Sequence, residues 1–316
     1  MITTEVSKNS TPAKSTGFDS RVILAFFAIY VLWGTTFLAI RIAVEEVPPL
    51  FAAGVRFFLA GVVLYGFMRS RGEPRPEAIQ WRNLAIIGLL MFVAEYGPLF
   101  WAEKYVPSGV TSVLVATMPL ITLVVEMLIF RQQRFRWSLL GAALLGFGGV
   151  GVLLLPDGRQ HFGILPCVAI LAGATTWSLG SVLNRSLELP KSRPLTAGAA
   201  MMLGGGVLLV LSAAFGEMHP LPHVSIRAAL ALLYLIVFGS LLAFTAFVWL
   251  LARMPATRVA SHAYVNPVVA VALGYFVAGE VITTRTVLGA ALVLTSVFLI
   301  LRREKSEVRG VPAVRD

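Results

Sequence analysis

The sequence predicts an all-α integral membrane protein of about ten transmembrane helices, built as two inverted five-helix repeats. Three observations predict this fold. Apolar segments of membrane-spanning length recur along the chain, basic residues alternate in abundance between them, and the two halves share a spaced set of residues. Of 316 residues, 57% are hydrophobic and 13% are charged, whereas a soluble domain carries about 25% charged residues. The shortage of charge indicates that lipid covers most of the surface.

A helix needs about 20 apolar residues to cross the hydrocarbon core, and ten segments have roughly this length. They lack the strict alternation of barrel strands, so we expect helices. Residues 1–21 and 303–316 are expected to be disordered tails. The predicted spans are 22–43, 50–68, 83–103, 106–130, 137–155, 163–183, 195–215, 228–251, 256–279 and 286–302.

Lys and Arg are distributed unevenly between the two sides that these spans define. With a cytoplasmic N-terminus, 20 of the 26 basic residues fall in the tails and inner connections, 5 fall in the outer connections, and Arg56 lies within a span. This bias follows the positive-inside rule, and shifting the topology by one helix would invert it. We therefore expect a multi-pass protein of a bacterial inner membrane with both termini in the cytoplasm. Because the net charge of +10 is spread over short connections, we expect no nucleic-acid partner.

Corresponding residues recur in the two halves at a nearly constant separation. Pro119 recurs 148 residues later as Pro267, and Trp33 recurs 144 residues later as Trp177. The steady offset indicates a duplication. Since each unit has five helices, an odd number, the second unit must lie inverted, as in many secondary transporters. The predicted units are 22–155 and 163–302.

Pro119 and Pro267 lie midway along their spans. A proline inside a helix frees the carbonyl four residues earlier, here those of Val115 and Ala263. Within a membrane a freed carbonyl needs a partner in protein, water or substrate, and interrupted helices at matching positions point to a transport site. A packing kink without ligand contact is the alternative.

Further polar and aromatic residues lie deep in the predicted spans. His262, Tyr264 and Asn266 accompany the second proline, where an unpaired polar group is costly. Asn266 could donate a hydrogen bond to a substrate carboxylate or carbonyl, or instead to another helix. Trp33 and Trp177 lie away from the interfaces where Trp usually collects, so they either line a pathway or pack against other helices.

Three charged residues fall within apolar spans. Arg56 and Glu95 lie at a similar depth, about 9–12 Å below the outer interface at the helical rise of about 1.5 Å per residue. Neighbouring helices could bring them together, either as an outer gate or as a static ion pair. Glu126 lies about one turn from Arg131 and is expected to reach the inner interface.

Motifs for catalysis or metal binding are lacking in the sequence, so we expect no enzyme activity, no cofactor and no metal site. The glycine-rich run Gly146–Gly151 lies inside an apolar span without a preceding strand, which favours close helix packing over nucleotide binding. His219 and His223 are separated by prolines that forbid a shared helical face. The single cysteine, Cys167, is interpreted as a core residue.

Several short motifs follow one another along the chain: Trp33-Gly34, Pro48-Pro49-Leu50, Gly54-Val55-Arg56-Phe57, Val106-Pro107-Ser108-Gly109, Val115-Ala116-Thr117-Met118-Pro119, Ala263-Tyr264-Val265-Asn266-Pro267-Val268-Val269 and Gly279-Glu280. Taken in this order and spacing, they resemble the EamA family of the drug/metabolite transporter superfamily over nearly the full chain, and are most like its YedA-type inner-membrane members. The resemblance implies ten helices, cytoplasmic termini and export of a small metabolite or drug-like substrate by alternating access, and it leaves proton coupling open. Glu280 matches an acidic family position, whereas the equivalent residue of the first half is Gln132. A membrane protein that does not transport, such as an assembly partner or receptor, remains the alternative.

Overall fold

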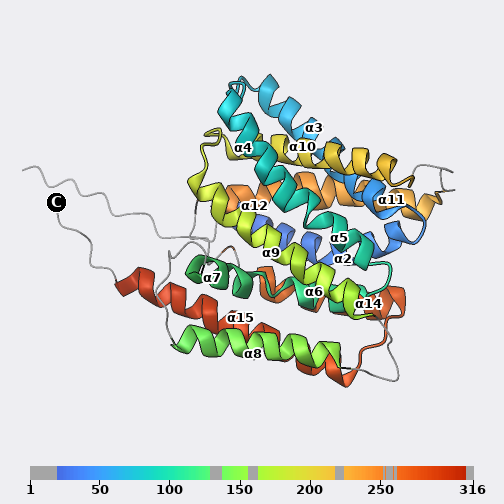
Figure 1. Ribbon diagram of the computed structural model, residues 1–316, viewed down its shortest axis with the longest axis vertical. Coiled ribbons are helices and arrows are strands. Elements are labelled where there is room, and N and C mark those ends of the chain that lie inside the picture. The colour runs from blue at the N-terminus through green and yellow to red at the C-terminus, as the bar shows by residue number, and fades with distance from the viewer. Residues whose placement is uncertain are drawn as a thin grey trace, which may run out of the picture.

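The computed structural model describes most of the chain, and every regular element in the described part is a helix (Figure 1). Seven helical segments of 20–25 residues are long and apolar enough to cross a membrane, and three shorter apolar helices account for the other predicted spans. The predicted all-helical membrane fold is therefore confirmed. Residues 1–19 and 311–316 of the predicted tails, and parts of the predicted spans 106–130 and 256–279, lie outside the described residues. Residues 20–21 begin the first helix and residues 303–310 continue the last one, so this part of the expected disordered tails is helical. The described residues are 20–128, 137–155, 163–217, 224–251, 253, 259 and 262–310.

The helices follow one another with short connections. The first five spans comprise α1 (Ser20–Phe27), η1 (Ala28–Leu32) and α2 (Trp33–Val44); α3 (Pro49–Ser70); α4 (Ala78–Gly88), η2 (Leu89–Val93) and α5 (Tyr96–Ala102); α6 (Ser108–Val115) and α7 (Met118–Leu128); and α8 (Trp137–Leu154). The second five comprise α9 (Ile164–Ser186); α10 (Arg193–Ala214); α11 (Ile226–Tyr234), η3 (Leu235–Leu242) and α12 (Ala243–Leu251); α14 (His262–Ala278); and α15 (Thr284–Gly310).

Among the described residues, three spans contain a π-helical segment, which the sequence did not predict. These segments are η1, η2 and η3. η2 and η3 begin 146 residues apart, at Leu89 and Leu235, close to the offset between the two halves. A π-turn inserts one residue into the helix and is frequently found at functional sites. The spans that carry η2 and η3 are therefore the first place to look for a site.

The two central prolines behave differently. The fourth span breaks between α6 and α7, just before Pro119, as predicted. By contrast, α14 continues through Pro267. The expected interruption at matching positions is therefore wrong for the second half, because one missing hydrogen bond does not end a helix that neighbouring helices hold in place.

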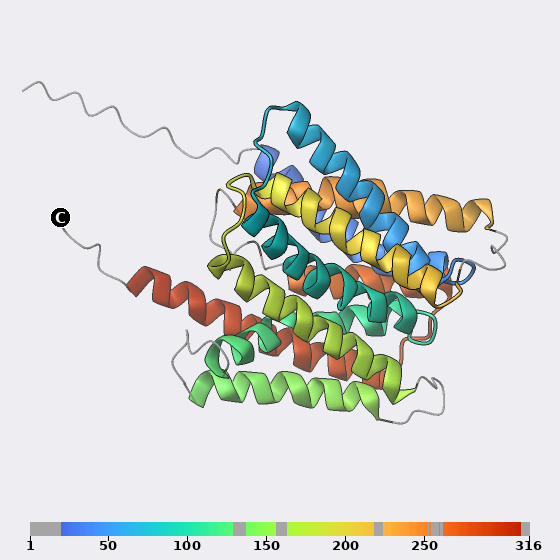
Figure 2. The same ribbon diagram turned by 45° about the horizontal axis from the view of Figure 1, so that its top comes forward.

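Three helices pack along the helix five spans further on: α3 along α10, α6 along α14, and α8 along α15 (Figures 1 and 2). Glycines set the approach of the first pair. A Cβ added to Gly61 would lie 2.2 Å from the main-chain nitrogen of Met202. The predicted packing role of the run Gly146–Gly151 holds for Gly149, where an added Cβ would lie 2.9 Å from the Gly289 carbonyl oxygen. Small residues let the backbones approach closely, as is common between membrane helices.

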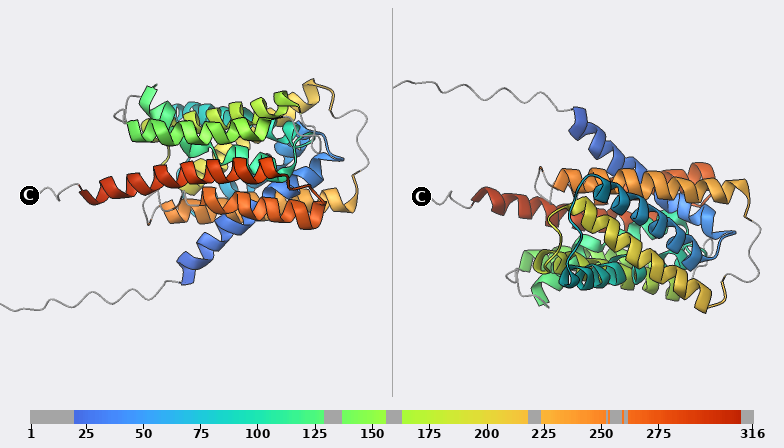
Figure 3. Two further views of the ribbon diagram at one scale, coloured as in Figure 1. Left: turned by 90° about the horizontal axis from the view of Figure 1, so that it is seen from below. Right: turned by 90° about the horizontal axis from the view of Figure 1, so that it is seen from above.

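The first described residues of α1 and the end of α15 lie on the same side of the helical bundle (Figure 3). The connections after α2, α5 and α14 lie at the other end, where Arg41 donates a hydrogen bond to the main-chain carbonyl of Glu103. The distribution of basic residues assigns this end to the outside. We call it the outer end, and the opposite end the inner end.

Candidate functional site

The π-helix η3 receives hydrogen bonds from two other spans. The indole Nε1 of Trp33 donates to the main-chain oxygen of Gly239 (3.0 Å), and Nε of Arg56 donates to the hydroxyl of Ser240 (3.0 Å). Glycine is needed for this approach, since a Cβ added at Gly239 would lie 2.9 Å from Cγ2 of Thr36 and 3.1 Å from Nη2 of Arg56. η3 therefore joins the first and second spans in the interior of the bundle.

The guanidinium group of Arg56 is buried, with the residue 2% exposed, and it lies among aromatic rings. Its Cζ is 4.7 Å from the ring centroid of Phe57, 5.3 Å from that of Tyr96 and 5.9 Å from that of Phe100. Cation–π contacts of this kind contribute about 0.5–2 kcal/mol each. The Nη1 group has no hydrogen-bond partner among the described residues. Arg56 is thus held in place with part of its donor set unused.

Glu95 is buried to the same degree, at 2% exposed, but it faces another helix. Its Oε2 would lie 2.7 Å from a Cβ added to Gly173 in α9, and this oxygen has no hydrogen-bond partner in the described structure. Arg56 and Glu95 form no ion pair, so the predicted pairing is wrong. The depth estimate assumed a regular helix. η2 precedes Glu95, and one inserted residue turns the following side chains by about 100° around the axis.

A continuous chain of aromatic rings connects the two tryptophans that the repeat relates. Ring centroids are 6.2 Å apart between Trp33 and Phe244, 6.4 Å between Phe244 and Phe92, and 6.4 Å between Phe92 and Trp177. Tyr96 lies beside this chain, 6.1 Å from Trp177. The rings come from spans of both halves. They form an apolar wall next to the buried charges.

His262 and Asn266 lie at the Trp33 end of the aromatic chain. The ring of His262 is 5.0 Å from that of Trp33 and nearly perpendicular to it. In the amide orientation that its surroundings favour, the side-chain nitrogen of Asn266 donates to the carbonyls of Ile29 and Tyr30, at 3.2 and 3.1 Å. These carbonyls belong to η1. Of the two roles open for Asn266, the structure favours a bond between helices.

The remaining predicted site residues lie apart from this chain. Within the described part of the structure, neither Val115 nor Pro119 makes a hydrogen bond or ring contact with it, and Val115 packs against the main apolar core. Pro267 is buried within α14. The side chain of Tyr264 lies outside the described residues. The charged and aromatic residues therefore gather at the π-helices rather than at the prolines.

At the outer end, carboxylates bind the starts of helices in other spans. Glu280 accepts hydrogen bonds from the main-chain nitrogens of Ser108 (2.7 Å) and Gly109 (3.1 Å), at the start of α6. Glu46 accepts from the main-chain nitrogen of Ser225 (2.6 Å) and from its hydroxyl (2.8 Å), where α11 begins. The main-chain hydrogen bond from Ser225 lowers the pKa of Glu46. A helix start favours a negative charge, so these contacts connect separate spans at the outer end.

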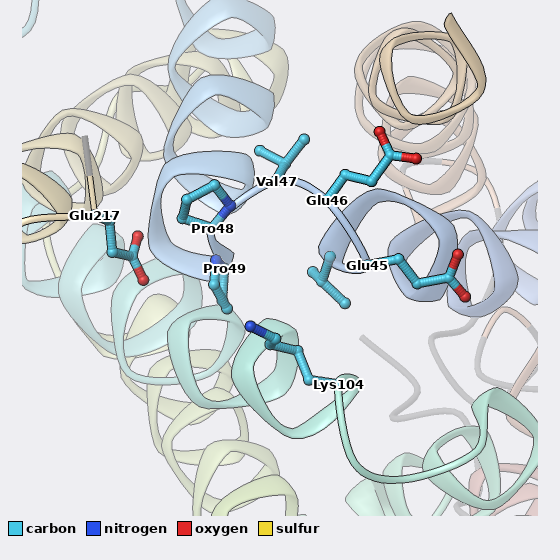
Figure 4. A pocket seen from close by; sticks show the side chains of 8 residues that line it. Glu45, Glu46, Val47, Pro48, Pro49, Lys104 and Glu217 are labelled. Atoms are coloured by element: carbon cyan, nitrogen blue, oxygen red, sulfur yellow. The ribbon is translucent and has the colours of Figure 1, made fainter. Parts of the chain in front are cut away.

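A pocket of about 230 Å³ lies between the outer connections. The amine of Lys104 points toward Pro49 in this pocket, while the carboxylates of Glu45 and Glu46 point away from it (Figure 4). The carboxylate of Glu217 binds the start of α3, with Oε2 3.0 Å from the main-chain nitrogen of Phe51. The pocket is lined by Val44, Glu45, Glu46, Val47, Pro48, Pro49, Lys104 and Glu217.

At the inner end, Glu126 is buried, and its Oε1 lies 2.9 Å from Nη1 of Arg185. The prediction that Glu126 reaches the interface beside Arg131 is therefore wrong. α7 packs against α9, which turns Glu126 toward that helix, and Arg131 lies outside the described residues. Arg185 follows Trp177 by eight residues, as Arg41 follows Trp33, yet Arg41 lies at the outer end. The two repeat-related arginines thus occupy opposite ends of the bundle.

Several residues of this region were not predicted from the sequence. Phe92, Tyr96 and Phe244 have no feature that separates them from other aromatic residues in apolar spans. Ser240 becomes a partner of Arg56 only because η3 brings it there. Glu103 could have been singled out, because it is an acidic residue at the end of an apolar span. The sequence does not show that its side chain is buried.

Known proteins share both the sequence pattern and the fold. The EamA-like transporter family model matches the chain twice, over residues 20–155 and 164–302. The uncharacterized inner membrane transporter YedA of Escherichia coli (strain K12) is 37% identical over 279 residues, covering 87% of this chain and 89% of that protein. The probable amino-acid metabolite efflux pump of the same organism is 25% identical over 287 residues, covering 88% and 93% of the two chains. The expected similarity to YedA-type transporters is confirmed.

The uncharacterized transporter YoaV of Bacillus subtilis (strain 168) is 25% identical over 286 residues, covering 88% of this chain and 96% of that protein. One solved crystal structure, 21% identical in sequence, superimposes with a TM-score of 0.63 over 90% of this chain and 99% of its own. At that identity the match supports the fold alone. The predicted multi-pass location in an inner membrane is confirmed by the similarity to YedA and by the seven long apolar helices.

Proposed function

This chain belongs to the EamA-like transporter family, and from that premise we propose that it is a secondary transporter that exports a small zwitterionic metabolite by alternating access. One observation carries the choice of substrate class. A basic and an acidic side chain, Arg56 and Glu95, are both buried between the helices, and each has a polar atom without a hydrogen-bond partner among the described residues.

Uncompensated charges inside a membrane protein are costly. A single charge at the centre of a membrane helix costs about 2.5–3.5 kcal/mol on insertion scales, and intramembrane ionisable residues usually serve transport or coupling. The unused Nη1 of Arg56 suits a carboxylate, because charge-assisted hydrogen bonds are strong and directional. The unused Oε2 of Glu95 suits an ammonium group. A molecule that carries both groups would satisfy the two side chains together.

The aromatic surroundings favour a small substrate with an apolar side. Tyr96 lies beside both charges: Cζ of Arg56 is 5.3 Å from its ring centroid, and Glu95 precedes it in the chain. Trp177 packs against Tyr96 from the second half. A relative at 25% identity is named a probable amino-acid metabolite efflux pump, which agrees with a zwitterion of amino-acid size. Both tryptophans lie next to the π-helical spans, whose rearrangement would open the site to either side.

The experiment is counterflow in proteoliposomes with a panel of amino acids, their decarboxylated amines and their N-acetylated forms. Hydrogen bonds to charged groups contribute about 1.5–3 kcal/mol, so the wild type should prefer the zwitterion over either analogue by roughly 10- to 100-fold. Arg56→Gln should lose the preference over the amine, and Glu95→Gln the preference over the N-acetylated form. Arg71→Gln, at an exposed arginine that follows α3, and Glu188→Gln, at an exposed inner connection, are the matched controls.

Two results would contradict this proposal. The first is a wild-type protein that moves no member of the panel. The second is an Arg56→Gln variant that transports with an unchanged preference between the zwitterion and the amine.

A further inference from the structure

A buried carboxyl group lies at the outer end, where three spans meet. Glu103 follows α5, one residue beyond the apolar span Ala78–Ala102, and it is 0% exposed. Neither of its carboxyl oxygens has a hydrogen-bond partner among the described residues. Arg41 reaches it from α2, but Nη1 of Arg41 donates to the main-chain carbonyl of Glu103 and not to the carboxyl group. The structure thus offers no donor that would stabilise an ionised Glu103.

A second carboxylate lies within electrostatic range of Glu103. Glu280 accepts hydrogen bonds from two main-chain nitrogens at the start of α6. Burial, and then the charge of Glu280, raise the pKa of Glu103 well above its ordinary value, while Arg41 acts in the opposite direction. Lys104, the next residue, is exposed and points into the outer pocket (Figure 4).

The surroundings of the two carboxyl groups are tightly packed but short of hydrogen bonds. The hydroxyls of Ser108 and Thr111 lie three residues apart in α6, both residues are 0% exposed, and neither hydroxyl has a hydrogen-bond partner in the part of the chain that the structure describes. A Cβ added to Gly274 would lie 2.3 Å from Oε2 of Glu280 and 3.2 Å from Oγ of Ser108. α14 is therefore pressed against the start of α6 at the point where Glu280 binds. A new charge at Glu103 would have no place in this packing without a movement of the helices.

We propose that Glu103 is a proton-binding site, and that its bound proton holds the outer end closed. When the proton leaves to the outer water, the carboxylate must be reached by the guanidinium of Arg41 or by water, and either change alters the contact between α2 and the end of α5 that Arg41 makes now. When one proton returns, the neutral carboxyl group can be buried again and the outer end closes. This inference rests on the proposed function, since only a transporter needs an outer end that opens.

The first test measures opening through a cysteine at Thr111 in a protein that also carries Cys167→Ala. The rate of labelling by an impermeant thiol reagent is measured from pH 5 to pH 10 and normalised to the rate of a Lys104→Cys variant, whose site is exposed. If opening releases one proton, the normalised rate should rise by about tenfold per pH unit until the open form predominates. Glu103→Gln, whose amide stays neutral, should remove this rise. Glu188→Gln at an exposed inner position should leave it unchanged.

A second measurement does not depend on the cysteine variant. Infrared spectra of purified protein with ¹³C-labelled glutamate should contain, at pH 7, a carbonyl band of a protonated carboxyl group. This band should be weaker in Glu103→Gln than in the wild type and in Glu188→Gln, because Glu95, which is also buried with an unpartnered carboxyl oxygen among the described residues, can contribute to the same band. Equal bands in all three proteins, or a labelling slope that persists in Glu103→Gln, would overturn the proposal. Protection by sodium but not by choline at high pH would also overturn it, because the site would then bind a metal cation.

Both measurements use the protein without substrate. If no compound of the counterflow panel is transported, the proposed function is contradicted. The infrared band and the labelling slope would still test the proton site. Conversely, counterflow of a panel compound together with a labelling rate that does not change with pH would contradict the proton site alone.

Discussion

Two glycines of α3 allow a direct test of how the halves are held together. In Gly61→Ala the new Cβ would lie 2.2 Å from the main-chain nitrogen and 2.6 Å from Cα of Met202, whereas ordinary contact begins at 3.4 Å. The shortfall is about 1.2 Å, and the obstacle is backbone, which cannot rotate away, so α3 and α10 must separate. Overpacking of this kind costs about 1–3 kcal/mol. We expect the upper end of that range, because Gly205 and Gly198 are pressed against α3 along the same contact.

Gly66→Ala is the matched control in the same helix, since nothing lies within 4 Å of its added Cβ. Both substitutions gain the helix propensity of alanine, about 1 kcal/mol, so the difference between them isolates the clash. The free energy of unfolding would be measured by titrating SDS into detergent micelles that hold each variant. Adding Gly205→Ala to Gly61→Ala should cost less than the sum of the single changes, because the helices have already separated. A Gly61→Ala protein as stable as Gly66→Ala would refute the reasoning.

Two further predictions concern contacts at the site and at the outer end. Trp33→Phe keeps a ring beside Phe244 but loses the hydrogen bond to Gly239. It should therefore lower the free energy of unfolding by about 0.5–1.5 kcal/mol, measured by the same SDS titration. An unchanged stability would show that water replaces the indole as the hydrogen-bond donor. Glu46→Gln tests the hydrogen bonds between Glu46 and Ser225. Because the pKa of Glu46 is lowered in the folded protein, the ionised carboxylate stabilises the fold above the ordinary carboxyl range. This stabilisation is lost as the pH falls through the lowered pKa. Glu46→Gln should therefore have a lower free energy of unfolding than the wild type at pH 7, and the two values should converge at low pH. A difference in stability that does not narrow on acidification would contradict this.

Much of the fold could be predicted because lipid imposes simple rules. Span length and the absence of alternation identify helices, and the same logic located the break before Pro119. Glycines in apolar spans were correctly interpreted as packing positions, as at Gly149. These predictions succeed because each depends on a property of one segment, such as its length, its charge or a missing backbone donor.

The site could be predicted only in part, because its contacts depend on the angle at which each side chain leaves its helix. Arg56 and Glu95 were identified from their charge in an apolar span, and their burial is correct. Their partners were wrong because η2 and η3 shift the helical register, and no residue type marks a π-turn. Glu103 was overlooked for a related reason: it is buried where Arg41 of α2, 62 residues earlier in the sequence, contacts it.

The two ends of this transporter differ in chemistry, although the halves are related by duplication. At the outer end the start of α6 is held by a carboxylate, that of Glu280. The residue that corresponds to Glu280 in the first half is Gln132, which lies outside the described residues, and an amide does not titrate. Glutamine at that position can hydrogen-bond a helix start, but it cannot force a proton onto a neighbouring carboxyl group. In the proposed mechanism, proton-dependent closure of the outer end uses Glu280 and Glu103, and the sequence places no titratable side chain at the duplicated position. For the proposed exporter, the outside pH would then act on release of the substrate and leave its loading from the cytoplasm unchanged.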